Sequence, residues 1–471
     1  MLVRLSDEAP LHLQVYRAFR EAILSGKIAP GSRLPSSRAE ARTLGVSRNV
    51  VLQAYGQLEA EGYIGGAQGS GTYVTSEIPE APAPLKGAVA ASGSPIPLSD
   101  YARRASHTML TGRRRLLPYD FAYGLSRPDE VAVRSWQRAL RRASEKLSLD
   151  YGPPEGDPDL REAIAHYLFR NRAVRTSAEH LVVVSGSQQG LSLVSRLLFE
   201  PGDRLLLEDP CYQGARQIFR ADGLELIPCP VREDGLEWPR AADAKAVYVT
   251  PSHQFPTGVT LPLAKRLKLL SWAQERNAVI LEDDYDSEYR YVSRPLGALQ
   301  GMDAHERVVY IGTFSKVLFP AVRVGYLVVP PSLWQRFVDA REAFDLFSPT
   351  LYQLALAEFL REGHFARHLR RMRGVYMARR DALLTGLARH CRDRLTVHNT
   401  DAGLHVAVLL SGGLDDRDVV RRMAGRGLTA TALSSCYAEP ARRSGLLLGF
   451  GGSTERRLLE ATRVLAEVLG D

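Results

Sequence analysis

The chain has 471 residues, too many for one ordinary hydrophobic core, so we expect two or more domains, one of them large. Hydrophobic residues account for 45% of the sequence and charged residues for 24%, close to globular averages, which excludes a disordered or fibrous chain. The formal net charge of +8 permits an anionic partner, and the arginines Arg33, Arg38, Arg42 and Arg48 indicate where nucleic acid would bind.

The cysteine pattern and the lack of long apolar stretches indicate the cellular compartment of the protein. Cys211, Cys229, Cys391 and Cys436 are far apart and form no CxxC pair, so we expect neither a metal site nor a disulfide framework. A charged stretch with Arg4, Asp7 and Glu8 follows Met1 in place of a continuous apolar run, and no segment approaches the ~20 apolar residues that cross a bilayer. The sequence therefore predicts a cytoplasmic protein without membrane contact.

Composition divides the chain into three parts. Residues 1–75 have the pattern of helices followed by a hairpin. Residues 76–117 contain five prolines among Ala, Ser and Gly, a composition typical of an extended linker that forms no core. Residues 118–471 alternate short apolar runs with helical patterns and form the large domain.

Residues 1–75 predict a winged helix-turn-helix. Periodic apolar residues indicate a helix over 10–25, and serine caps indicate a short helix after Ser36 or Ser37 and a longer one after Ser47. The last two helices are joined by a short turn that contains glycine, as in helix-turn-helix domains. The glycine-rich stretch 62–74 indicates a two-stranded wing.

The second helix of such a pair presents its N-terminal residues to the major groove of DNA. The stretches GSRLPSSRAEARTLGVSRNVVLQAYGQLEAEGYI and GSGTYV closely resemble the winged-helix domain of the GntR family, over nearly all of residues 10–75. The resemblance implies double-stranded DNA as a partner. It places the DNA contacts on Arg38, Ser47, Arg48, Asn49 and the wing residue Gly69. Leu52 stands where the family often has a further base-reading arginine, so the operator sequence does not follow from the resemblance.

The pattern of the large domain predicts an α/β fold. Short apolar runs predict strands over 181–184, 204–207, 224–228, 246–249, 278–281, 308–311 and 325–328. Helical patterns such as 262–276 lie between several of them, which is typical of a mostly parallel sheet with crossover helices. After about residue 334, long helices and strands such as 405–410 and 446–449 predict a small C-terminal α+β subdomain.

One lysine has an unusual setting. The stretch GTFSKVLFPAVRVGY places Lys316 after a predicted strand, between Thr313 and Ser315 on one side and Arg323 on the other. A Schiff base requires a lysine, and a neighbouring phosphate requires hydroxyl groups and an arginine. The alternative is an ordinary surface lysine, because isolated SK pairs are common.

Acidic and aromatic residues follow the preceding strand. In ILEDDYDSEYRY, Asp283 could keep a pyridine nitrogen protonated, and Tyr285 could donate to a phenolate oxygen. Alternatively, carboxylates at a strand end cap a helix or bind a metal ion.

Two further stretches complete the pattern. In VVVSGSQQGL a strand leads into Ser187 and Gln188 at a helix start, a position that binds phosphate, although such turns are common. In LEDPCYQGAR, Tyr212 follows a strand and could stack on a flat cofactor or simply be a buried aromatic residue.

Together these stretches resemble the fold-type-I pyridoxal-phosphate-dependent aminotransferases across residues 120–471. With VYVTPSHQFPTGVTLP and the GntR-like start, the chain resembles the MocR/GabR group of regulators. The resemblance implies that Lys316 forms the Schiff base with pyridoxal 5'-phosphate, Asp283 pairs with the pyridine nitrogen and Tyr285 bonds the phenolate oxygen. It also implies that Tyr212 stacks on the ring and that the phosphate is surrounded by Ser187, Gln188, Thr313, Ser315 and Arg323.

The sequence departs from the aminotransferase pattern at two places. Phe255 replaces the asparagine that usually precedes the proline of the PTG turn, and either His253 or Gln254 takes over its cofactor contact. In the late strand GLLLGFGG, Leu447 occupies the position of the arginine that holds a substrate carboxylate in many members. Leucine cannot replace that clamp, which weakens the case for amino-acid transamination.

The leading hypothesis is a DNA-binding transcription regulator whose aminotransferase-like domain senses a small molecule through Lys316. The effector would be an amine, an amino acid or pyridoxal phosphate itself, and the resemblance implies a head-to-tail homodimer. The alternative is an active aminotransferase with an appended DNA-binding domain. A binding module that no longer uses the cofactor is a third hypothesis, which the presence of Lys316 and Asp283 disfavours.

Overall fold

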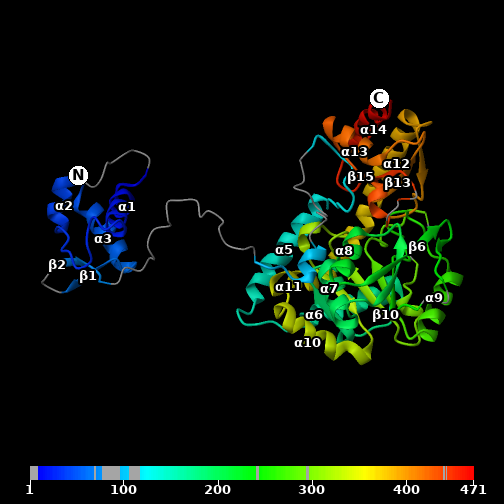
Figure 1. The fold of residues 1–471 in the computed structure, drawn as a ribbon, viewed down its shortest axis with the longest axis horizontal. Helices are drawn as coiled ribbons and strands as arrows, with labels where there is room; N and C mark the ends of the chain where they lie inside the picture. Colours follow the sequence, from blue (N-terminus) through cyan, green and yellow to red (C-terminus); the bar gives the residue numbers. More distant parts are fainter. Residues whose placement is uncertain are drawn as a thin grey trace. The chain divides into compact units, whose positions relative to one another are not determined.

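The structure is a computed structural model that describes residues 9–67, 71–76, 96–105, 117–239, 243–292, 296–438, 441 and 443–470. The chain divides into two compact units, Met1–Pro97 and Leu98–Asp471, which are described separately (Figure 1). In the described part, no helix is both long enough and apolar enough to cross a lipid bilayer.

The first unit is a winged helix-turn-helix, as predicted. It contains α1 (Leu11–Leu24), α2 (Ser37–Leu44), α3 (Arg48–Ala60) and a hairpin of β1 (Ile64–Ala67) and β2 (Gly71–Val74). Ser36 Oγ accepts a hydrogen bond from Ala39 N at 3.2 Å, and Ser47 Oγ accepts one from Val50 N at 3.4 Å, which confirms Ser36 and Ser47 as helix caps. Gly45, with φ 68°, ends α2 in the left-handed conformation and allows the turn into α3.

A short helix, α4 (Asp100–Ala105), lies inside the range predicted as a linker and belongs to the second unit. Arg104 Nε donates a hydrogen bond to the Ala221 carbonyl at 3.0 Å, and the Arg196 guanidinium lies 5.1 Å from the Tyr101 ring centroid. These contacts attach residues 100–105 to the large domain, although the proline-rich composition gave no sign of a helix there.

The second unit is built on an eight-stranded sheet. The strand order is β4 (Leu181–Val184), β11 (Gly325–Val328), β10 (Val308–Thr313), β9 (Val279–Asp284), β8 (Ala246–Val249), β5 (Arg204–Asp209), β6 (Glu225–Arg232) and β7 (Gly235–Leu236). β11 runs antiparallel to both of its neighbours and β7 runs antiparallel to β6, whereas the other neighbouring pairs are parallel. β4, β8 and β11 are buried along their whole length, which explains why their sequences are continuous apolar runs.

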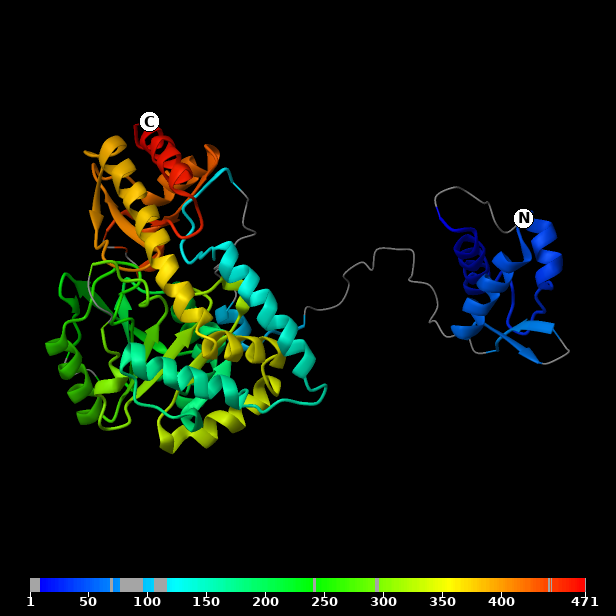
Figure 2. The same cartoon turned by 180° about the vertical axis from the view of Figure 1, so that it is seen from behind.

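Helices cover both faces of this sheet, giving three layers (Figures 1 and 2). They are α5 (Glu130–Lys146), α6 (Pro158–Arg172), α7 (Ser187–Leu198), α8 (Gln213–Ala221), α9 (Leu263–Glu275), α10 (Trp334–Asp345) and α11 (Thr350–Arg361). Side chains of α7, α8 and α10 share one core with the sheet, and those of α6, α9 and α11 pack on the opposite face.

The predicted C-terminal α+β subdomain is present. Its antiparallel sheet has the order β12 (Leu395–His398), β13 (His405–Leu410), β16 (Gly445–Gly449) and β15 (Thr431–Ala432), with helices α12 (His364–His390), α13 (Asp416–Gly425) and α14 (Glu455–Gly470). A separate parallel pair joins β3 (Tyr119–Asp120) to β14 (Leu428–Thr429) and ties the start of the second unit to this subdomain.

Candidate cofactor site and DNA-binding face

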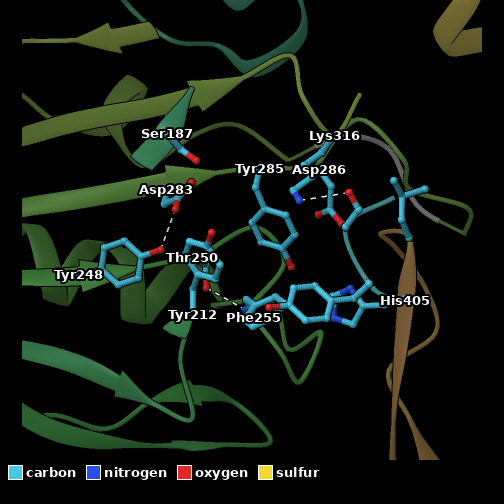
Figure 3. A pocket seen from close by; sticks show the side chains of 13 residues that line it. Ser187, Tyr212, Tyr248, Thr250, Phe255, Asp283, Tyr285, Asp286, Lys316 and His405 are labelled. Carbon is cyan, nitrogen blue, oxygen red and sulfur yellow. Dashed lines mark hydrogen bonds between the residues drawn. The ribbon is translucent and has the colours of Figure 1, made fainter. Parts of the chain in front are cut away.

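A pocket lies at the carboxyl ends of β8, β9 and β10, the place where open α/β sheets bind ligands. Its lining residues are Tyr123, Gly124, Ser187, Tyr212, Tyr248, Thr250, Phe255, Asp283, Tyr285, Asp286, Lys316, Leu404 and His405 (Figure 3). Five of the residues predicted from the sequence to hold the cofactor are therefore brought together: Ser187, Tyr212, Asp283, Tyr285 and Lys316.

Asp283 stands near the end of β9, and only one of its carboxylate oxygens has a partner. Tyr248 OH donates a hydrogen bond to Asp283 Oδ2 at 2.7 Å, whereas Oδ1 is buried with no hydrogen-bond partner among the described residues. Burial raises the pKa of Asp283 to about 7, against the lowering effect of the Tyr248 bond. A buried acceptor without a donor costs about 1–3 kcal/mol. The site therefore fits a ligand N–H group, such as a protonated pyridine nitrogen.

Lys316 follows β10 and enters the pocket opposite Asp283 in the view of Figure 3. Its Nζ donates a hydrogen bond to the Gly124 carbonyl at 3.2 Å. Burial lowers the pKa of Lys316, which favours the neutral, nucleophilic amine, while Asp286 and Asp283 act in the opposite direction. Gly124 has φ 75°, and a Cβ there would lie 2.3 Å from Nζ, so a larger residue would displace the lysine.

Of the two residues proposed to replace the missing asparagine, His253 approaches Tyr285 and Gln254 does not. His253 Nδ1 lies 2.9 Å from Tyr285 OH and 2.8 Å from Asp286 Oδ1. The Gln254 side chain instead donates to the Pro210 carbonyl at 2.8 Å and is buried in its own turn. His253 therefore orients the phenol that the sequence assigned to the cofactor oxygen.

The first turn of α7 forms one side of the expected phosphate site. Gly186, with φ 95°, precedes the helix, and the N–H groups of its first turn have no partners within the helix. The side chain of Gln188 donates to Tyr212 OH at 2.9 Å, so it holds the aromatic ring and leaves only its backbone N–H for an anion. Ser187 lines the pocket itself.

The remaining predicted phosphate residues lie around the β10 end. Arg323 Nη2 donates to the Ser185 carbonyl at 2.7 Å, which places the guanidinium beside the start of α7. Arg323 has φ 49°, a left-handed conformation that costs about 1–2 kcal/mol in a residue other than glycine. Thr313 Oγ1 accepts a hydrogen bond from Ser315 N at 3.1 Å, and Ser315 Oγ is buried without a partner in the described part of the chain. The unused hydroxyl and the cation suit a phosphate.

The far wall of the pocket is apolar and neutral. His405 is buried, its pKa is lowered to about 4 by burial, and it is therefore uncharged near neutral pH. Leu447 is fully buried in a cluster with Phe255, so no cation occupies its position. Two arginines precede β16 in the sequence: Arg443 lies in a separate groove, and Arg442 is outside the described residues.

Several pocket residues were not predicted from the sequence, among them Tyr123, Tyr248, Thr250, Asp286 and His405. Tyr248 lies inside a buried strand, so its sequence context indicates an ordinary core aromatic residue. Its role becomes visible only from the pairing of β8 with β9, which brings the Tyr248 hydroxyl to Asp283. His405 comes from a strand of the small subdomain, whose folding back over the pocket no local pattern reveals.

On the first unit, four of the predicted DNA contacts form one exposed surface. Arg38 lies on α2, and Ser47, Arg48 and Asn49 lie at the start of α3, all exposed. Arg48 Nε donates a hydrogen bond to Ser37 Oγ at 3.3 Å, which connects the two helices. Gly69 lies outside the described residues. Leu52, at the position of the family's further base-reading arginine, is 44% exposed on the same helix.

Comparison with known proteins agrees with this division. Residues 11–74 match the bacterial regulatory proteins of the gntR family, and residues 120–447 match the aminotransferases of class I and II. The chain is 37% identical to the probable rhizopine catabolism regulatory protein MocR of Rhizobium meliloti, over 97% of this chain and 93% of the relative. The chain belongs to the MocR-type transcriptional regulators.

Other relatives of this regulator include the pyridoxine biosynthesis transcriptional regulator PdxR of Corynebacterium glutamicum, 35% identical over 97% of this chain and 94% of PdxR. Among solved structures, the second unit is similar to the α-aminoadipate aminotransferase LysN of Thermus thermophilus, with a TM-score of 0.72 and 30% identity. That match covers 79% of this chain and 97% of LysN. The gntR match implies DNA binding and the aminotransferase match implies pyridoxal phosphate binding.

Proposed function

We propose that this MocR-type regulator controls transcription in response to a small molecule that acts at pyridoxal phosphate held on Lys316. One observation carries the proposal: Lys316 and Asp283 line the same pocket, and Asp283 Oδ1 has no hydrogen-bond partner among the described residues. Both groups have the chemistry that the cofactor needs, an amine at one end and a buried carboxylate at the other. The same chain carries an exposed recognition helix, α3.

The residues of the chain would hold the cofactor at three points. Asp283 would accept the pyridine N–H on Oδ1, Tyr285 would donate to the phenolate oxygen, and the start of α7 with Arg323 would hold the phosphate. When bound, pyridoxal phosphate supplies an aldehyde that combines reversibly with primary amines. The lowered pKa of Lys316 keeps its amine available for that attachment.

The effector would be an amine, an amino acid or pyridoxal phosphate itself. The described lining of the pocket contains no arginine, and His405 is neutral, so apart from Lys316 the lining offers no cation for a carboxylate. This favours the first or the last of these. The effector would change transcription only if it bound one arrangement of the dimer more tightly than another and so shifted the equilibrium between them. An active aminotransferase remains the alternative, since Lys316 and Asp283 occupy the positions that such an enzyme uses.

We also propose that the regulator works as a head-to-tail homodimer. Leu149 and Tyr151 are 98% and 79% exposed on the loop after α5, and the Tyr151 ring lies edge-on to Phe347 at 5.9 Å. Leu346 and Phe344, at the end of α10, are also exposed. Apolar side chains gathered on a surface in this way are typical of a protein interface.

Replacing Arg48 by Ala is expected to weaken binding of the full-length regulator to its operator by about 10-fold or more, because an arginine contact to a base or phosphate contributes about 1–3 kcal/mol. The measurement is fluorescence anisotropy with a duplex from the region upstream of the gene. Arg17→Ala, an exposed arginine of α1, which carries none of the predicted contacts, is the matched control. Equal affinities for wild type and Arg48→Ala would argue against this DNA-binding face.

A further inference from the structure

The surplus positive charge of the chain lies almost entirely in the second unit. Met1–Pro97 contains nine Lys and Arg against eight Asp and Glu, so +7 of the formal net charge of +8 belongs to Leu98–Asp471. Two helices of the second unit together have a net positive charge larger than that of the whole unit. α5 and α12 together contain eleven Arg and one Lys against three acidic residues, a net charge of +9.

These two helices lie side by side where α12 begins, and α11 packs against both (Figure 2). α5 buries its small residues and Trp136 against the core, which turns its arginines to the solvent. The exposed arginines of α5 and of the first part of α12 form what we call the arginine surface: Arg134, Arg138, Arg141, Arg142, Arg367, Arg370 and Arg373.

Much of this charge is not neutralised by neighbours. Arg134 pairs with Glu130 at 3.3 Å, where both side chains are exposed, and Arg142 pairs with the half-buried Glu358 at 3.0 Å. By contrast, no carboxylate partner exists among the described residues for four members, Arg138, Arg141, Arg367 and Arg370. Arg367 Nη2 instead donates to a backbone carbonyl, that of Glu362, at 2.8 Å.

The pKa of a histidine within this surface is influenced by arginines of both helices. His364 is the first residue of α12, and Arg367 Nη2 lies 3.0 Å from its Nδ1. Partial burial lowers the pKa of His364, and the guanidinium groups of Arg367 and Arg138 lower it further. Arginines of α5 and α12 therefore both act on His364, although Glu362 and Glu358 partly offset their effect.

We propose that the arginine surface contacts the phosphate backbone of DNA beside the sequence read by the winged helix. Guanidinium groups bind phosphate oxygens in pairs and without sequence preference, and DNA is the polyanion that the proposed function already brings to this regulator. A second copy of the chain is a poor occupant, because two such surfaces would repel each other. This inference rests on the proposed function, since a protein that binds no DNA has no use for the contact.

The test compares the salt dependence of DNA binding for three full-length proteins. The first is wild type. The second, the arginine-surface variant, carries Arg138→Gln, Arg141→Gln, Arg367→Gln and Arg370→Gln. The matched control carries Lys268→Gln, Arg336→Gln, Arg457→Gln and Arg463→Gln, four exposed cations on α9, α10 and α14. The probe is a duplex of several helical turns from the region upstream of the gene.

Each phosphate contact contributes about 0.9 to the slope of log K against log salt. We expect the slope of the arginine-surface variant to be less steep by about 2–4 and its affinity at physiological salt to fall by about 10-fold or more, with the control close to wild type. Hydroxyl-radical footprints should be shorter for the variant. Equal slopes and footprints for all three proteins would overturn the inference, as would an equal loss in the control, whereas failure of wild type to bind any duplex would refute the proposed function itself.

Discussion

The Asp283→Asn variant is expected to bind pyridoxal phosphate on the order of 100-fold more weakly than wild type. The carboxylate is buried at the end of β9 with Oδ1 unpartnered, and an amide there cannot compensate the charge of a protonated pyridine. Removing one partner of a buried charge pair costs about 2–5 kcal/mol. Titration of the cofactor-free protein with pyridoxal phosphate, followed by absorbance, measures the effect.

The same variant is expected to stabilise the cofactor-free protein above neutral pH. The pKa of Asp283 is raised to about 7 in the folded chain, so the folded state holds a proton that the unfolded state releases near pH 4. Stability contributed by this group is therefore present below pH 4 and is lost as the pH rises to about 7. The difference in unfolding free energy between Asp283→Asn and wild type should grow over that range, and a difference independent of pH would contradict the assignment.

The Arg172→Met variant is expected to lower the free energy of unfolding of the second unit by about 3–5 kcal/mol, because it leaves a buried carboxylate without its counter-charge. The guanidinium lies 2.7 Å from Asp284 Oδ2, with both side chains almost fully buried, and Nη2 donates to Ser252 Oγ at 2.8 Å. Tyr310 OH also donates to Asp284 at 2.5 Å. The network fixes the end of β9, next to Asp283, so cofactor affinity should fall as well.

Denaturant unfolding of the cofactor-free protein measures this effect. Arg336→Met, at an exposed position of α10, is the matched control and should change stability by less than about 0.5 kcal/mol. The double variant Arg172→Met with Asp284→Asn should recover much of the loss, because both charges are then removed together. A double variant no more stable than Arg172→Met would show that packing, and not the unpaired charge, causes the loss.

The sequence was most informative where local chemistry and periodicity coincide. Apolar runs located the strands, and the polar residues just after them located Asp283 and Lys316, because ligands bind at the carboxyl ends of parallel strands. β5, β9 and β10 continue two to three residues beyond the predicted ends, to Asp209, Asp284 and Thr313. The apolar runs end where the polar residues of the site begin, although the backbone hydrogen bonds of these strands continue past that point.

Residues whose role depends on long-range packing were not predictable. His405 reaches the pocket from the small subdomain, and Tyr248 becomes a partner of Asp283 only through the pairing of β8 with β9. The choice between His253 and Gln254 likewise required the fold of the PTG turn. The roles taken from the family resemblance for Lys316, Tyr212 and the phosphate residues stay predictions until a cofactor complex is measured.

The most direct test of cofactor sensing through Lys316 combines two measurements on the full-length regulator, with Lys316→Ala and the exposed-lysine control Lys268→Ala beside wild type. Near-ultraviolet and visible absorbance reports covalent attachment of pyridoxal phosphate, and anisotropy reports operator binding with and without the cofactor. We expect wild type and Lys268→Ala to show the absorption band and to change their operator affinity when the cofactor is added, whereas Lys316→Ala should show neither. A wild type with no band in excess cofactor, or a Lys316→Ala variant whose operator binding responds like wild type, would contradict cofactor sensing through Lys316.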